Sequence, residues 1–377
     1  MNILIAPDSF KESLSASEVA DCIERGILNI RPDISCSKIP LADGGEGTVE
    51  AILNATGGRK ITASVKDPLM RNIESFWGLL PDSQTAVIEM AAASGLELLS
   101  NDERNPMLTS SFGTGQLIKS ALDHGCRKIY IGIGGSATND GGAGMAMALG
   151  VRLLDVNGLD IGNGGVNLSD LRSLDLSGID DRIIESELMV ISDVQNPLCG
   201  VHGASLIYGP QKGADHEMAL RLDKNLSHFG KILESSFGKS IINEPGAGAA
   251  GGLGAGLMAF CNAKLFPGFE TISEIVQLKK FIQKSDLIIT GEGKLDYQTK
   301  YGKVPYGVAL MAKKFNKPVI GVAGTLGNGY EELYKYGFKE IFSISEGIES
   351  LEYSILNAKN LLIKASEKII QNISIDL

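Results

Sequence analysis

The sequence has little of what marks a disulfide-linked or membrane-spanning protein. Its five cysteines are odd in number and dispersed, without a CxxC pair. Such cysteines predict reduced thiols in a cytosolic protein. No apolar run reaches the roughly 20 residues that span a bilayer. The amino terminus also lacks the basic and small-residue pattern of a secretory signal. We therefore expect a cytoplasmic protein without membrane contact.

The sequence also lacks an excess of basic residues. Its 35 lysines and arginines face 45 acidic residues, for a formal net charge of −10. Proteins that bind nucleic acid need clustered Lys and Arg to displace counterions from phosphates, so we expect no nucleic-acid partner. An anionic small molecule would have to be held by a few local lysines and backbone amides, because the overall field opposes its approach.

Glycine is abundant, and it is clustered. The 377 residues contain 46 glycines, many of them in short polar loops. Clustered glycine indicates backbone that approaches a ligand closely. The length exceeds what one hydrophobic core usually serves, which favours two domains.

The order of apolar and polar segments predicts alternating strands and helices at both ends of the chain. Asn2 to Ala6 is predicted as a strand, and Ser15 with Glu18 forms a capping box before a helix. The alternation returns from Asp286 onward, whereas the middle begins with a hairpin pattern and continues in long glycine-rich loops. We predict an α/β domain of residues 1–65 and 286–377, interrupted by an inserted α/β domain of residues 66–285. Two contiguous domains remain the alternative.

Two polar loops follow the first predicted strands. The segment DSFKES contains Asp8, Ser9 and Lys11, and ADGGEGT contains Asp43. Carboxylates and a lysine at the mouth of a sheet suit Mg²⁺ and phosphate, because Mg²⁺ prefers hard oxygen ligands. A loop salt bridge and a capped turn are the structural alternatives.

The longest motif is GIGGSATNDGGAGMAMALG, where a strand leads into a glycine loop and then an alanine-rich helix. Amides at a helix start bind anions, so this loop is a candidate phosphate site. Asp140 is a candidate metal ligand, and Lys212 in PQKGA is a candidate phosphate contact. GAGAAG also fits a dinucleotide-binding pattern, but its context argues against a dehydrogenase.

Three further segments carry candidate site residues. Arg71 in DPLMR suits a carboxylate because its guanidinium presents paired donors. VISDVQNP places Asp193 and Asn196 after a strand, where the carboxylate can accept a proton or share a magnesium ion. TGEGKLDYQT adds further charged and polar side chains. Each alone is also common as a surface, cap or turn residue.

Taken together and in this order, these motifs resemble the bacterial type I glycerate kinase family over nearly the whole chain. The resemblance implies a flavodoxin-like, doubly wound parallel-sheet domain, interrupted by an inserted mixed α/β domain like the restriction-endonuclease fold, with the active site between them. It implies an enzyme that transfers the γ-phosphoryl group of ATP to D-glycerate with Mg²⁺. The product is expected to be 2-phosphoglycerate, with 3-phosphoglycerate as the alternative.

On this resemblance each candidate residue receives an expected role. The expected catalytic residues are Asp193, Lys11 and Asp8. The expected substrate-binding residues are Arg71, Lys11, Asn196 and Ser9. The expected ATP-binding residues are Gly134, Gly135, Ser136, Thr138, Asn139, Lys212 and Lys294. The expected magnesium ligands are Asp43, Asp140 and Asp296. A kinase of another small hydroxy acid and a non-catalytic metabolite-binding protein remain open, and so does assembly into a homo-oligomer.

Overall fold

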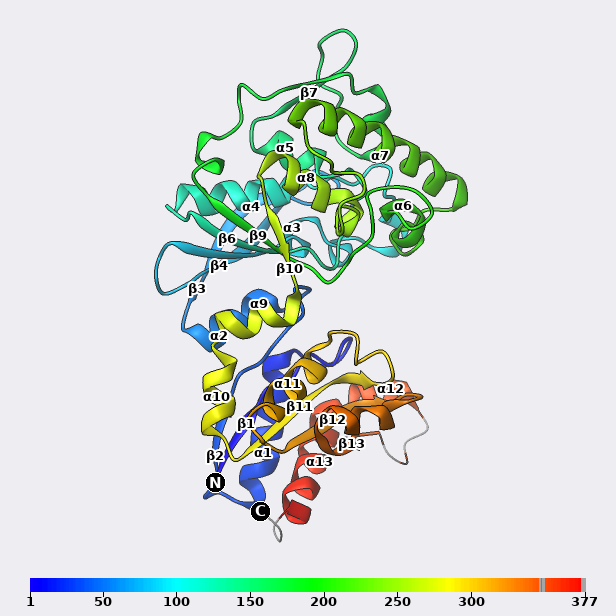
Figure 1. Ribbon diagram of the computed structural model, residues 1–377. Helices are drawn as coiled ribbons and strands as arrows, with labels where there is room; N and C mark the ends of the chain where they lie inside the picture. The colour runs from blue at the N-terminus through cyan, green and yellow to red at the C-terminus, as the bar shows by residue number, and fades with distance from the viewer. Residues whose placement is uncertain (346, 348–349, 374–377) are drawn as a thin grey trace. The chain divides into compact units, whose positions relative to one another are not determined.

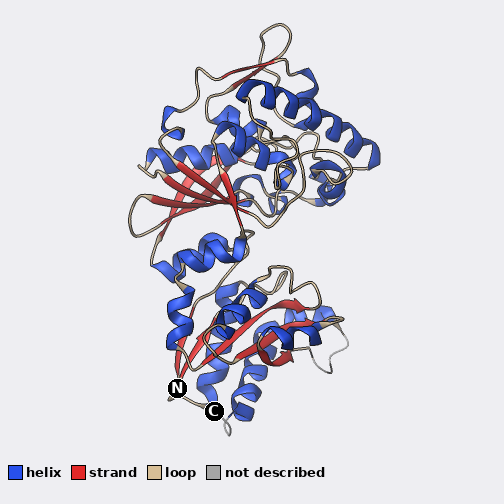
Figure 2. Cartoon of the chain, viewed as in Figure 1, coloured by secondary structure: helices blue, strands red, loops and turns tan. Residues whose placement is uncertain are grey.

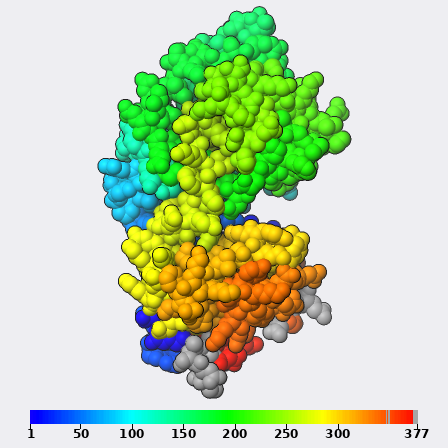
Figure 3. Space-filling model, in the orientation of Figure 1, coloured from blue at the N-terminus to red at the C-terminus, as the bar shows by residue number. Residues whose placement is uncertain are grey.

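The chain folds as an α/β protein with two compact units. The computed structural model describes residues 1–345, 347 and 350–373. The first unit contains residues 1–43, 50–57 and 268–377, and the second contains residues 44–49 and 58–267. Blue, yellow, orange and red atoms meet on the surface of the first unit (Figure 3), so this unit is built from both ends of the chain.

The first unit is built around a five-stranded sheet in which every strand pair is parallel. The strand order is β2-β1-β11-β12-β13 (Figure 1). The strands are β1 Asn2–Ile5, β2 Ser35–Lys38, β11 Leu287–Leu295, β12 Val319–Leu326 and β13 Phe338–Ser343. This is the order of one class of doubly wound folds, in which ligands bind at the carboxyl ends of the strands where the chain direction across the sheet reverses.

Helices accompany this sheet, and one pair of them packs closely. They are α1 Ala16–Ile30, α2 Thr48–Thr56, α9 Gly268–Ile275, α10 Leu278–Lys284, α11 Val304–Lys313, α12 Leu351–Leu356 and α13 Ala358–Ile373. The capping box of Ser15 and Glu18 at the start of α1 is confirmed. Gly26 on α1 lies against α13, where a Cβ atom would come within 2.5 Å of the carbonyl oxygen of Ile363. Glycine is therefore required for this close approach of the two helices.

The second unit contains a six-stranded mixed sheet of order β10-β9-β6-β5-β4-β3. Its strands are β3 Arg59–Lys66, β4 Asn72–Leu79, β5 Thr85–Glu89, β6 Lys128–Gly132, β9 Glu187–Ile191 and β10 Lys264–Phe266, with a separate pair β7 Arg152–Leu154 and β8 Ser173–Asp175. The pairs β3·β4 and β4·β5 are antiparallel, whereas β5·β6, β6·β9 and β9·β10 are parallel. The predicted hairpin is β4·β5, and this prediction is confirmed.

Helices and long loops of the second unit lie above and beside its sheet in the view of Figure 2. The helices are α3 Ala91–Ser94, α4 Phe112–Asp123, α5 Ala143–Ala148, α6 Ala204–Tyr208, α7 His216–Phe237 and α8 Leu253–Phe260. Each unit has its own cluster of buried apolar side chains, centred on Ile3, Ile289 and Ile320 in the first and on Trp77, Ile131 and Phe229 in the second.

The limits of the units differ from the sequence-based boundaries. Residues 59–65 belong to the second unit because β3 pairs with β4 along its whole length. Helices α9 and α10 belong to the first unit, although the prediction had placed residues 268–284 in the inserted domain. The likenesses to the flavodoxin and restriction-endonuclease folds stay predictions.

No helix within the described parts of the chain combines the length and the apolar character that crossing a membrane requires.

Candidate functional site

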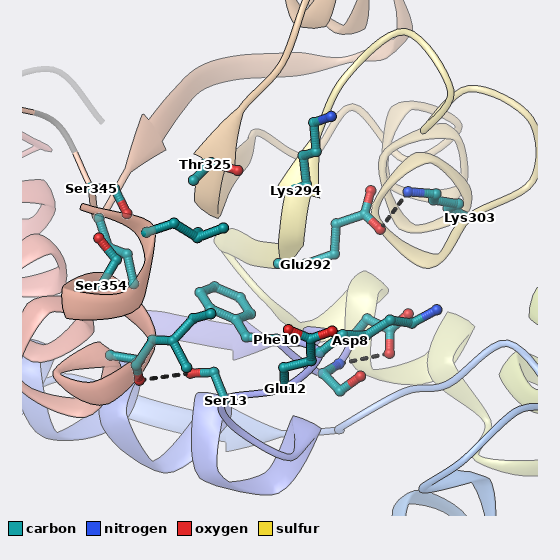
Figure 4. Close-up of a pocket in the computed structure, with 18 of the residues that line it drawn as sticks. Asp8, Phe10, Glu12, Ser13, Glu292, Lys294, Lys303, Thr325, Ser345 and Ser354 are labelled. Carbon is teal, nitrogen blue, oxygen red and sulfur yellow. Dashed lines mark hydrogen bonds and ion pairs between the residues drawn. The ribbon is translucent and has the colours of Figure 1, made fainter. Parts of the chain in front are cut away.

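A cavity of about 400 Å³ opens in the first unit at the carboxyl ends of the parallel strands (Figure 4). Its lining comes from the loops after β1 and β2, the second half of β11, the residue before α11, the end of β12, the segment after β13, α12 and the start of α13. The loop after β1 and strand β11 flank the point where the sheet order reverses. Such a position is where doubly wound folds bind ligands. The polar lining residues are Asp8, Ser9, Lys11, Glu12, Ser13, Asp43, Glu292, Lys294, Lys303, Thr325, Ser345 and Ser354.

Asp8 lies in a concentration of negative charge. Burial, together with the carboxylates of Asp43 and Glu292, raises the pKa of Asp8 from 3.8 to about 7, although the backbone N–H of Ser9 and the charge of Lys11 act in the opposite direction. The Ser9 N–H donates to Asp8 Oδ1 over 2.6 Å. A bound cation would relieve this repulsion, because an opposite charge favours the ionised carboxylate.

Glu292 is the buried member of the acidic group. Burial raises the pKa of Glu292. Lys303 Nζ donates to its Oε2 over 3.0 Å, and Thr299 Oγ1 donates to its Oε1 over 2.7 Å. Both carboxylate oxygens are therefore held, and the side chain is fixed at the edge of the cavity (Figure 4).

Asp296 and Lys294 form a pair beside the cavity. Lys294 Nζ lies 3.3 Å from Asp296 Oδ2, and Lys294 is largely exposed. Asp296 is buried and its Oδ1 accepts the N–H of Gln298 over 2.9 Å. The predicted metal role of Asp296 stays a prediction, and in the structure this carboxylate organises the turn after β11.

The donor set of the cavity fits a magnesium nucleotide. Among the residues that the structure describes, no cluster of three or more His, Cys, Asp or Glu side chains is arranged to hold a metal ion. Mg²⁺ does not need such a cluster, because it commonly takes one or two carboxylates, substrate phosphates and several waters. Asp8 and Asp43 supply hard oxygen donors, and Lys11 and Lys294 supply positive charge for phosphates.

In the second unit, Lys212 is buried beneath the glycine loop that follows β6. Its side chain is 1% exposed, and its Nζ donates to Ser136 Oγ over 2.6 Å and to the carbonyl oxygen of Thr138 over 2.7 Å. Burial lowers the pKa of Lys212 from 10.5 to about 7, and the nearby carboxylate of Asp140 opposes that shift. Lys212 thus holds the loop from below, and its predicted contact with a phosphate of ATP stays a prediction.

Only the start of the glycine loop is open to solvent. Gly135 is exposed and Gly134 is half-buried, whereas Ser136, Thr138 and Asn139 are buried. Asn139 Nδ2 donates to Ser205 Oγ over 2.8 Å. The N–H of Gly134 already donates to the carbonyl oxygen of Gly44 over 3.3 Å, so the amide of Gly135 is the better candidate for phosphate. The ATP role of the loop stays a prediction.

Asp140 is buried completely and is used by the protein itself. Its Oδ2 accepts the N–H of Ser111 over 2.8 Å, the hydroxyl of Ser111 over 2.9 Å and the N–H of Gly144 over 3.2 Å, while Oδ1 accepts the N–H of Gly142 over 3.1 Å. Burial raises the pKa of Asp140, and these hydrogen bonds oppose the rise. The carboxylate joins the starts of α4 and α5, which leaves it poorly suited to a metal ion.

Asp193 and Asn196 follow β9, as the sequence predicted. Asp193 is exposed. Asn196 braces the loop, because its Nδ2 donates to the carbonyl oxygen of His202 and its Oδ1 accepts the hydroxyl of Tyr208, both over 2.8 Å. Their predicted catalytic and substrate-binding roles stay predictions.

Arg71 is already engaged by two carboxylates. Its guanidinium donates to Asp67, to Glu103 over 2.6 Å and to the carbonyl oxygen of Leu98 over 3.3 Å. A substrate carboxylate at Arg71 would have to share or displace these partners, so its predicted role stays a prediction.

The structure thus brings several of the predicted site residues together in one cavity, and residues that were not predicted line it with them. Asp8, Ser9, Lys11, Asp43 and Lys294 line one cavity. Sequence reasoning assigned no role to Thr325, Ser345 and Ser354, which also line it. Single Ser and Thr residues carry no motif; their only signal was a position at or beyond the end of a predicted parallel strand or on the following helix.

Comparisons with known proteins agree on one family. The sequence profile of the glycerate kinase family matches residues 3–374. A protein from Halalkalibacterium halodurans named glycerate kinase is 49% identical over 97% of both chains. A protein from Escherichia coli K12 named glycerate 2-kinase is 48% identical, covering 100% of this chain and 99% of its own. A crystal structure described as glycerate kinase 2 from Salmonella typhimurium LT2 superposes with a TM-score of 0.87 at 47% identity, covering 99% of this chain and 98% of that one.

Proposed function

Because the chain belongs to the glycerate kinase family, we propose that it transfers the γ-phosphoryl group of ATP to the 2-hydroxyl of D-glycerate, giving ADP and 2-phosphoglycerate. The observation that carries this proposal is the full-length similarity to the Escherichia coli protein named glycerate 2-kinase. The acidic and basic side chains around the cavity of the first unit support it, since phosphoryl transfer depends on cations and positioned donors.

In this proposal the residues of the cavity hold the triphosphate. Asp8 and Asp43 would bind Mg²⁺, which when bound neutralises charge on the phosphates. Lys11 and Lys294 would contact phosphate oxygens. Lys303 keeps Glu292 in place through the ion pair described above.

The acceptor side of the reaction is assigned to the second unit. Asp193 would accept the proton of the attacking hydroxyl or orient it. Its exposure at the carboxyl end of β9 supports this assignment. Asn196 would act indirectly, by holding the conformation of the loop that carries Asp193 through its hydrogen bonds to His202 and Tyr208.

Phosphorus NMR of the purified protein with ATP, Mg²⁺ and D-glycerate tests the function directly. We expect 2-phosphoglycerate and ADP, and loss of both when Mg²⁺ is chelated. Formation of 3-phosphoglycerate would keep the kinase but change the attacking hydroxyl. Turnover only with another hydroxy acid, or nucleotide binding without turnover, would contradict the proposal.

The role of Asp193 predicts the effect of Asp193→Asn. We expect kcat to fall by about 100- to 10,000-fold, the usual contribution of a positioned base, while KM for both substrates changes little. Steady-state kinetics beside Asp102→Asn, an exposed site in the same unit, provides the control. An unchanged kcat in Asp193→Asn would remove Asp193 from the mechanism.

A further inference from the structure

The cavity of the first unit has two chemically different ends. The acidic end is formed by the carboxylates and lysines described above. The other end is mostly apolar. Phe10, Ile344, Leu351, Ile355 and Ala358 line it, together with Ser13, Ser345 and Ser354 (Figure 4). Phe10 and Ile344 are 3% and 7% exposed, whereas Leu351 is 63% exposed, so this end has a buried apolar floor and an open rim. An elongated ligand with one apolar, flat end and one charged end matches this division.

We propose that the apolar end binds the purine ring of ATP, with the phosphates directed toward Asp8 and Asp43, and that Ser345 Oγ hydrogen-bonds to the edge of the ring. This assignment rests on the proposed kinase function, which requires ATP but does not say where its base lies.

Ser345 supplies the polar group that such a ring needs. Its Oγ is buried and has no hydrogen-bond partner among the described residues, and Ser345 as a residue lines the cavity (Figure 4). A rotation about χ1 would present this hydroxyl to a ligand in the cavity. A buried hydroxyl without a partner costs free energy, which a ligand that pairs with it would recover. Ring nitrogens and an exocyclic amine at the edge of a purine can both pair with a hydroxyl.

The walls around Ser345 are held in place without a ligand. The N–H of Ser345 donates to Ser343 Oγ over 3.1 Å, and that hydroxyl donates to the carbonyl oxygen of Gly324 over 3.2 Å. The backbone of Phe10 exchanges hydrogen bonds with that of Leu14, and Ser13 Oγ donates to the carbonyl oxygen of Ile355 over 3.4 Å. A fixed pocket loses little conformational entropy when a rigid ring enters it.

The size of the whole cavity indicates an occupant larger than glycerate. A volume of about 400 Å³ lies in the range of about 300–1,000 Å³ that is typical for pockets burying a drug-sized ligand. Glycerate is much smaller and carries polar groups on each carbon, which would be desolvated without partners against Phe10 and Ile344.

Two variants of Ser345 test the assignment by isothermal titration calorimetry of the full-length protein. Ser345→Phe fills the apolar end, and we expect it to weaken binding of adenosine and of Mg·ATP at least tenfold. Ser345→Ala removes one hydrogen bond, and we expect a loss of about two- to tenfold. Binding of magnesium tripolyphosphate, which has no base, should change less than twofold in both variants.

Ser35→Phe, on the exposed edge strand β2 of the same unit, is the matched control and should bind all three probes like the wild-type protein. The proposal is overturned if adenosine binds Ser345→Phe as tightly as the wild type, if it does not bind the wild type, or if Ser345→Phe raises only the KM for glycerate. Calorimetry measures binding without turnover, so it tests the position of the purine ring separately from the kinase activity. If adenosine binds as expected but glycerate is not phosphorylated, the proposed function fails and the binding assignment stands.

Discussion

At the scale of single residues, Lys212 shows how a buried side chain can hold a glycine loop from inside the protein. The Nζ atom pairs with one side-chain oxygen and one backbone oxygen of the loop, in a place where water does not reach. A neutral amine can donate both hydrogen bonds, which agrees with the lowered pKa of Lys212. The shape of the exposed part of the loop, at Gly134 and Gly135, then depends on a residue far along the sequence.

Lys212 predicts a specific dependence of stability on pH. Between pH 7 and about 10 the unfolded chain carries a proton on Lys212 that the folded chain has released, so this group makes the free energy of unfolding rise as pH rises. Lys212→Met should remove that rise, flattening the profile by about 1–3 kcal/mol. It should also destabilise the protein at pH 9, because two loop oxygens lose their donor.

Urea denaturation at several pH values measures both effects, with Lys224→Met, at an exposed site on α7, as the control. If the wild type and Lys212→Met gave parallel profiles between pH 7 and 10, Lys212 would keep its proton in the folded protein.

The sequence located the charged residues of the cavity better than the uncharged ones. Asp8 and Asp43 stand in short loops directly after β1 and β2, and Lys294 lies in the glycine-bearing stretch of β11, so local patterns marked them. Lys212 lay in an equally clear turn, but no local pattern shows that its side chain points into the protein. Burial depends on the packing of distant segments, which the sequence around a residue does not specify.

At the scale of elements, Asp140 joins two helix starts. The first backbone N–H groups of a helix have no partner within the helix, and a carboxylate there also interacts favourably with the helix dipole. Asp140 accepts the N–H of Ser111, immediately before α4, and that of Gly144, in the first turn of α5. One side chain therefore ties together the starts of two helices that contact each other.

This structural role predicts the result of Asp140→Asn. An amide can replace some of the accepted hydrogen bonds but places an NH₂ group against N–H donors, so we expect a loss of about 2–4 kcal/mol in the free energy of unfolding. The Mg²⁺ concentration needed for half-maximal activity of the folded fraction should not change. A normal stability combined with a strongly increased Mg²⁺ requirement would instead support the predicted metal role of Asp140.

Element positions followed the sequence pattern closely where strands are buried and less closely at edges. The strand expected before the loop of the longest glycine motif is β6, Lys128–Gly132, in the middle of its sheet. The strand expected before ADGGEGT is β2, Ser35–Lys38, at the edge of the first sheet, and it ends four residues before that motif begins. An edge strand has one partner, so pairing with β1 sets its limits more than its own apolar residues do.

At the scale of the whole molecule, the sheet of the first unit depends on both ends of the chain. Strand β1 pairs with β2 on one side and with β11 on the other, with Ile3 opposite Leu287. The second unit has its own sheet and its own core, and almost all of it is one continuous stretch.

This organisation predicts that a fragment of residues 58–267 folds without the rest of the chain. We expect a cooperative urea transition by circular dichroism, at lower stability than in the full protein, because the fragment lacks the hydrogen bond from the N–H of Gly134 to the carbonyl oxygen of Gly44. Residues 1–57 alone should show no cooperative transition. A non-cooperative loss of signal from fragment 58–267 would mean that its core needs the first unit.

The pairing of β1 with β11 also has a consequence for synthesis on the ribosome. Strand β1 leaves the exit tunnel early, but its partner at Leu287 to Ile289 is translated only after the whole second unit. At about 5–20 residues per second, the interval is on the order of tens of seconds. During that time α1 can contact β1 and β2, but the part of its apolar face that α13 will later cover stays uncovered. Exposed apolar surface of this kind makes partly folded chains prone to aggregation and is what chaperones protect.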